Sequence, residues 1–125
     1  MAGSSASLHE DPEVLPKEAV DRHRALVSIM EELEAVDWYD QRAVATHDPE
    51  LAAILSHNRD EEKEHAAMTL EWLRRNDPKW SEVLSTYLFT DGSVLKVEKE
   101  AEHGEGENAG GDGSLGIGGL GGENA

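Results

Sequence analysis

Apolar residues recur at helical spacing along two long stretches of the chain. The first runs from about residue 13 to 46, and its apolar positions are Val20, Leu26, Val27, Ile29, Met30, Leu33 and Val36. The second starts at Asp48-Pro49, where the aspartate can cap a helix and the proline suits the first turn. It ends near Arg75, because Pro78 disfavours helical geometry in the residue before it. The pattern predicts two long helices with a very short connection.

A third, shorter helix is predicted from Pro78 to about Phe89, and Asp91-Gly92 reads as a turn. Beyond Val97 the chain becomes acidic and then glycine-rich, and glycine loses the most conformational freedom on ordering. We therefore expect three regions. They are a disordered lead over 1–12, a helical domain over 13–96 and a flexible tail over 97–125. The tail segment DGSLGIGGL (112–120) carries three aliphatic residues that a linker does not need, which suggests a docking peptide.

Residues able to bind a metal lie inside the apolar stripes. At about 100° per residue, Glu62 and His65 fall among the leucines and tryptophan of the second helix. Glu32 lies in the middle of an apolar face of the first helix, and Tyr39 follows two turns later on that face. A carboxylate in such a place is costly to bury unless it is paired or bound to a metal. The Glu62-x-x-His65 spacing lets both side chains reach one metal ion.

The chain therefore carries half of a known kind of di-metal site. In ferritin-like bundles, two helices each supply a lone Glu and the other two each supply a Glu-x-x-His pair. Two copies of this chain supply the whole set, so the sequence predicts a site on a dimer axis with Glu32, Glu62 and His65 of both chains as ligands. Mixed carboxylate and imidazole ligation suits iron or manganese. A buried Glu–His or Glu–Arg network that specifies the dimer remains the alternative.

The predicted fold class follows from the same features. A short connection favours an antiparallel hairpin, and a lone hairpin leaves much of its apolar stripe exposed. We expect an all-α protein, a two-helix antiparallel hairpin plus a short C-terminal helix, pairing into a ferritin-like four-helix bundle across a dimer interface. A folded part of about 80 residues is also marginal for a single core, which favours oligomerisation.

Two further clusters lie on other faces of the helices. Glu31, Glu34 and Trp38 share a face distinct from that of Glu32, where they either guide cations inward or form a solvated surface with Trp38 in an oligomer contact. On the second helix, an outer face carries three side chains that either bind a metal or are simply solvated: His57, Glu61 and Glu64.

Composition narrows the function classes. The formal net charge is −16, from 27 acidic and 11 basic residues, which argues against nucleic acid and anionic membranes as partners and favours attraction of cations. There is no cysteine, so disulfides and thiolate metal sites are excluded. With no long apolar run and no secretory signal, we expect a soluble intracellular protein.

Three segments resemble the encapsulated ferritins, the ferroxidase cargo of encapsulin nanocompartments. They are MEELEAVDWYD (30–40), NRDEEKEHAAM (58–68) and EWLRR (71–75), and the likeness covers about residues 13 to 90. The segment at 112–120 resembles the peptide by which such cargo docks inside an encapsulin shell.

The resemblance implies a ferroxidase centre completed by two subunits, an annular homodecamer, and iron storage inside the shell in the bacterial cytoplasm. By position, Glu32, Glu62 and His65 match the iron ligands and Tyr39 matches a residue beside the site. Glu31, Glu34 and Trp38 match the region where metal enters. An accessory site at a subunit interface, for a divalent cation such as calcium, is matched by His57, Glu61 and Glu64.

Two other functions stay open at this point. One is another di-metal carboxylate enzyme, such as a peroxidase or oxygenase, which needs a pocket for an organic substrate. The other is a non-catalytic helical scaffold or metal buffer, which binds cations and leaves Fe(II) oxidation at its background rate.

Overall fold

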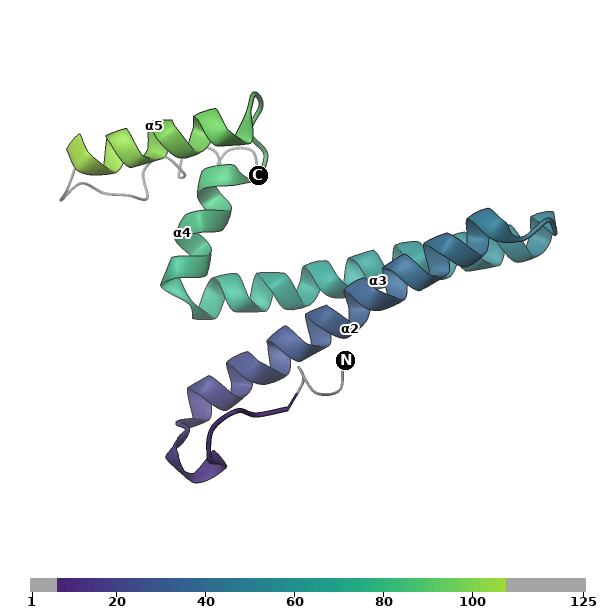
Figure 1. Ribbon diagram of the computed structural model, residues 1–125, viewed down its shortest axis with the longest axis horizontal. Helices are drawn as coiled ribbons and strands as arrows, with labels where there is room; N and C mark the ends of the chain where they lie inside the picture. Colours follow the sequence, from purple (N-terminus) through teal and green to yellow (C-terminus); the bar gives the residue numbers. More distant parts are fainter. Residues whose placement is uncertain (1–6, 108–125) are drawn as a thin grey trace. The chain divides into compact units, whose positions relative to one another are not determined.

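The computed structural model describes residues 7–107, and every regular element in that range is helical (Figure 1). In chain order the elements are the 3-10 helix η1 (Pro12–Val14) and the α-helices α2 (Lys17–Ala45), α3 (Pro49–Asn76), α4 (Pro78–Tyr87) and α5 (Val94–Glu107). The all-α prediction is confirmed. The chain divides into two compact units, one ending at Leu73 and the other beginning at Arg74.

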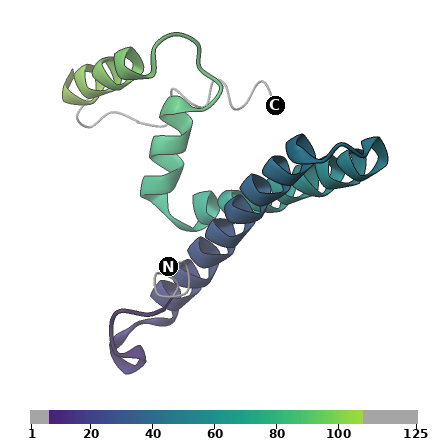
Figure 2. The ribbon, with the colours of Figure 1, turned by 45° about the vertical axis from the view of Figure 1, so that its right-hand side comes forward.

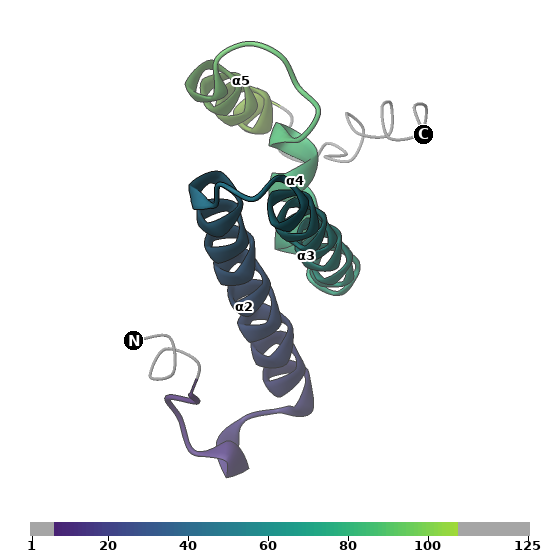
Figure 3. The same ribbon diagram turned by 90° about the vertical axis from the view of Figure 1, so that its right-hand side faces the viewer.

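The first unit is built on a helical hairpin. Helices α2 and α3 adjoin at their short connection, run antiparallel, and diverge with distance from it (Figures 1, 2 and 3). The predicted cap is present, since Asp48 Oδ1 accepts hydrogen bonds from the backbone N–H groups of Glu50 (2.9 Å) and Leu51 (3.2 Å). Such a cap stabilises a helix by about 1 kcal/mol. The Asp48-Pro49 signal therefore fixes where α3 begins.

The N-terminal boundary differs from the prediction. Helical structure was expected from about residue 13, but only the short η1 forms there and α2 begins at Lys17. Leu15 and Pro16 are extended, with ψ of 128° and 158°. Because a proline disfavours α geometry in the residue before it, Pro16 separates the two helices.

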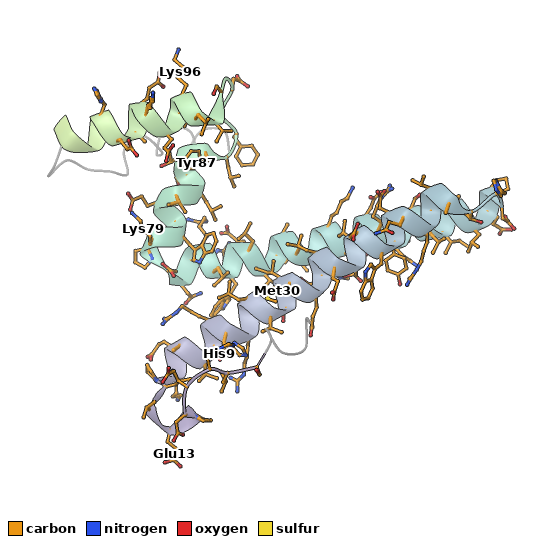
Figure 4. The ribbon with its side chains drawn as sticks, viewed as in Figure 1. His9, Glu13, Met30, Lys79, Tyr87 and Lys96 are labelled. Carbon is orange, nitrogen blue, oxygen red and sulfur yellow. The ribbon has the colours of Figure 1, made fainter. Side chains whose placement is uncertain are left out.

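The hairpin buries few apolar side chains on its own. Among the described residues the buried apolar ones are Ala25, Ala66 and Leu73. Met30, near the middle of α2 (Figure 4), is 41% exposed. Other large apolar residues of the hairpin are exposed as well: Leu26, Leu33, Trp38, Val44, Leu51, Ile54, Met68 and Trp72. Large apolar side chains exposed in this number favour association with another apolar surface.

Helix α4, in the second unit, is short and capped at its N-terminus. Asp77 Oδ1 accepts hydrogen bonds from the backbone N–H groups of Lys79 (3.0 Å) and Trp80 (3.2 Å). Helix α4 ends at Tyr87, two residues before the approximate end predicted at Phe89, because Leu88 is already extended, with ψ of 143°. Phe89 follows in a left-handed conformation with φ of 62°. Gly92, with φ of 88°, occupies the turn expected at Asp91-Gly92.

Helix α5 was not among the predicted helices. A flexible tail was expected from residue 97, but the chain is helical from Val94 to Glu107. Ser93 Oγ accepts a hydrogen bond from the N–H of Lys96 (3.3 Å), and the alanine, lysine and glutamate that follow are strong helix formers. The proposed docking segment, 112–120, lies outside the described residues. None of the helices between residues 7 and 107 combines the length and the hydrophobicity that a membrane span requires.

Candidate metal centre

Glu32 lies in the middle of α2 and carries a buried carboxylate oxygen without a hydrogen-bond partner. The side chain as a whole is half-buried, but its Oε1 atom is fully shielded. Within residues 7–107 it is the one buried side-chain polar atom in this condition. Leaving such an acceptor unsatisfied costs about 1–3 kcal/mol, and more when the group is charged. The atom fits a role as a metal ligand, because a cation would satisfy it.

Glu62 and His65 lie one turn apart on α3. His65 Nδ1 is 3.6 Å from Glu62 Oε1, which is too long for a hydrogen bond. The side chain of His65 is 44% exposed and that of Glu62 is 27% exposed, so both remain accessible to a metal ion. With ligand bonds of about 2.1 Å, two donors of one metal lie at most about 4.2 Å apart. The observed spacing therefore lets both atoms bind a single ion.

One chain does not hold a complete site. In the described part of the chain, no three or more His, Asp or Glu side chains gather into a group able to hold a metal ion. Glu32 on α2 is therefore not clustered with Glu62 and His65 on α3. The dimer-axis arrangement stays a prediction for two copies of the chain.

Tyr39 is half-buried on α2, seven residues after Glu32. The guanidinium carbon of Arg42 lies 5.6 Å from the centroid of the tyrosine ring, a cation–π distance. The sequence analysis gave Arg42 no role, although its spacing from Tyr39 is one helical turn.

The other predicted residues lie at the surface of the hairpin. Glu31 and Trp38 are exposed and Glu34 is half-buried, all on α2. On α3, His57 Nε2 is 3.8 Å from Glu61 Oε2, with side chains 70% and 49% exposed. Glu64 is exposed too. The entry of cations at the cluster on α2 stays a prediction, and so does the binding of an accessory cation at the cluster on α3.

An arginine that the sequence analysis passed over connects the two helices. Arg59 Nη1 donates to Asp40 Oδ1 (2.8 Å) across the hairpin, and its Nε donates to Asp60 Oδ1 (3.0 Å) on its own helix. Asp60 also pairs with Lys63 Nζ at 3.3 Å. The bonds to Asp60 and Asp40 raise the pKa of Arg59, and the bonds from Arg59 and Lys63 lower the pKa of Asp60.

Comparison with known proteins places this geometry in context. The sequence profile of the EncFtn-like family matches residues 7–91. A protein of Rhodospirillum rubrum named encapsulated ferritin-like protein is 65% identical over 133 residues, covering 100% of this chain and 95% of that protein. The encapsulin nanocompartment cargo protein EncC of Myxococcus xanthus is 36% identical over 69 residues, 53% of each chain.

A solved structure resembles the fold. The crystal structure of protein ne0167 from Nitrosomonas europaea matches with a TM-score of 0.68 and 56% sequence identity. The match covers 70% of this chain and 97% of that one.

Proposed function

The chain belongs to the EncFtn-like family, as its sequence indicated, and we propose that it is a ferroxidase whose di-iron site is completed by two copies of the chain. The observation that carries the proposal is the unsatisfied, buried Oε1 atom of Glu32. A buried carboxylate without a partner destabilises a single chain. A bound cation would supply the missing partner and remove this destabilisation.

Two chains supply a donor set that suits two ferrous ions. Glu32 and Glu62 from each chain bring four carboxylates, whose charge balances that of two Fe(II) ions. His65 binds metal as the neutral imidazole and adds no charge. Fe(II) is the substrate and molecular oxygen accepts its electrons.

The carboxylates also favour the reaction. Coulomb attraction to an anionic ligand grows with the charge of the ion, so Glu32 and Glu62 stabilise Fe(III) more than Fe(II). Tyr39 lies on the same face of α2 and borders the site. The net charge of −16 draws cations toward the protein, with Glu31, Glu34 and Trp38 as the approach to the centre. His57, Glu61 and Glu64 hold an accessory cation such as calcium.

The exposed apolar surface of the hairpin supports association. A four-helix bundle formed by two hairpins buries apolar side chains that a single chain leaves in water. Further association into an annular homodecamer is part of the proposal.

The names of two relatives suggest the partner. One is called an encapsulated ferritin-like protein and the other an encapsulin nanocompartment cargo protein. We propose that this chain is likewise cargo of an encapsulin shell in the bacterial cytoplasm, bound through residues 112–120, and that it delivers oxidised iron for storage there. Deleting 112–120 should abolish co-purification with the shell protein and leave iron oxidation intact. Unchanged co-purification would eliminate the docking role.

Stopped-flow oxidation of Fe(II), with oxygen uptake recorded in parallel, tests the activity. The wild-type protein should consume oxygen in proportion to added Fe(II) without an organic substrate, which separates a ferroxidase from a di-metal oxygenase. Glu32→Ala and His65→Ala should reduce the rate to background. Oxidation by the wild type at the background rate would favour a scaffold or metal buffer instead.

A further inference from the structure

The bond from Arg59 to Asp40 links the helix that carries Glu32 to the helix that carries Glu62 and His65. It joins side chains 19 positions apart in the sequence, with Nη1 and Oδ1 at 2.8 Å. Arg59 is the more enclosed partner, with 22% of its side chain exposed against 54% for Asp40. We propose that Arg59 is a positioning residue that sets the axial register of α2 against α3, a role that rests on the proposed function.

The position of this bond suits that role. Arg59 precedes Glu62 by three residues, about 4.5 Å along the helix axis, and Asp40 follows Glu32 by about 12 Å. A slip of one residue between the helices displaces their ligands by about 1.5 Å, whereas a working site tolerates about 0.5 Å. A contact that fixes how α2 and α3 align along their axes therefore controls whether the ligands of the site come together correctly.

Apolar packing within the hairpin gives little help with register. Two of its three buried apolar residues are alanines, Ala25 and Ala66, whose small side chains offer few ridges to interlock. A charge-assisted hydrogen bond is directional and short, so it resists sliding better than contacts between methyl groups.

Arginine is the residue type that this geometry requires. Its planar fork donates from Nε to Asp60 on its own helix and from Nη1 to Asp40 on the other, so one rigid group makes both bonds at once. A lysine keeps the charge but offers a single ammonium on a flexible stem, without the rigid fork.

The test uses three variants of the full-length chain: Arg59→Lys, Asp40→Asn and the matched control Asp60→Asn. The control removes a carboxylate bound to the same guanidinium but leaves the α2–α3 bond in place. Each is measured for Fe(II) oxidation rate, for the visible absorption of Co(II) bound in place of iron, and for its thermal unfolding midpoint.

Arg59→Lys and Asp40→Asn should each slow oxidation by about 10- to 100-fold, since a displacement near 1 Å costs that much. Both should alter the Co(II) spectrum. Their combination should be no worse than either alone, because they remove the same contact. The control should stay within about twofold of wild type, with all midpoints within a few degrees.

Wild-type rates and spectra in Arg59→Lys and Asp40→Asn would overturn the proposal, and so would an equal loss in the control. Failure of both variants to fold would overturn it as well, because the contact would then serve the fold rather than the site. The Co(II) spectra distinguish a failure of the Arg59 proposal from a failure of the ferroxidase proposal. If the wild type binds Co(II) but fails to oxidise iron, the ferroxidase assignment fails while the spectra still decide the role of Arg59.

Discussion

Helix α3 carries two acid–histidine pairs with nearly the same N···O distance but different exposure to solvent. His65 Nδ1 and Glu62 Oε1 are 3.6 Å apart, and His57 Nε2 and Glu61 Oε2 are 3.8 Å apart. The side chains of the first pair are 44% and 27% exposed, whereas those of the second are 70% and 49% exposed. Spacing alone therefore does not separate the pair proposed to bind iron from the one proposed to hold an accessory cation.

Burial separates the two pairs. The pair at 62 and 65 lies within the apolar stripe of α3, where a second chain would exclude water and strengthen electrostatic interactions with a cation. The pair at 57 and 61 faces solvent, where ion pairs contribute about 0–1 kcal/mol and hydration competes with any bound cation. The prediction that the pair at 62 and 65 binds the reacting iron therefore depends on its place in an apolar stripe, and not on its N···O distance.

The largest effect is expected from Glu62→Ala compared with Glu61→Ala. Loss of Glu62 should lower the rate of Fe(II) oxidation by at least about 100-fold. Losing a residue that only hydrogen-bonds to a metal ligand typically costs about 10- to 100-fold, and losing a ligand itself should cost more. Loss of Glu61 should cost less, because a cation held at the proposed accessory site would not react. Single-turnover kinetics under identical metal loading measures both, and equal losses would erase the distinction between the two pairs.

A second expected effect concerns stability without metal. Replacing Glu32 by leucine removes the unsatisfied buried oxygen, so the metal-free protein should gain about 1–3 kcal/mol while losing its activity. Denaturant unfolding in the presence of a chelator measures the gain, with Glu31→Leu on the exposed neighbour as the matched control. A destabilised Glu32→Leu protein would mean that the carboxylate already has a partner.

The smallest effect on stability is expected at the solvent-exposed pair, His57 and Glu61. His57→Ala should weaken calcium binding to the assembled protein and change the unfolding free energy by less than about 1 kcal/mol. Calorimetric titration with calcium and denaturant unfolding provide the two values. A loss of several kcal/mol would show that this pair is buried in an interface.

The sequence predicted those features of the fold that local chemistry determines. Asp48 and Asp77 each cap a helix that begins with proline, so the starts of α3 and α4 were correct. Errors arose at the ends of the predicted helices and beyond the last of them. Pro16 delays α2, the extended Leu88 ends α4 early, and helix-forming residues build α5 partly in a segment expected to be flexible.

For the site, helical periodicity was enough to place Glu32, Glu62 and His65 on apolar stripes. It was not enough to identify the bond between Arg59 and Asp40, which depends on how α2 and α3 align with each other. The register of two helices results from their packing, and neither helix reveals it alone. The predicted arrangement of two chains around one site likewise depends on how the chains assemble, which the sequence of one chain does not reveal.

The most direct measurement is native mass spectrometry of protein loaded anaerobically with Fe(II), combined with an oxidation assay on fractions separated by size. A site shared between two chains predicts that monomers carry no iron and oxidise none, while dimers and larger assemblies bind about one iron per chain and are active. A monomeric fraction that holds iron and oxidises it at the rate of the assembled protein would contradict the shared site.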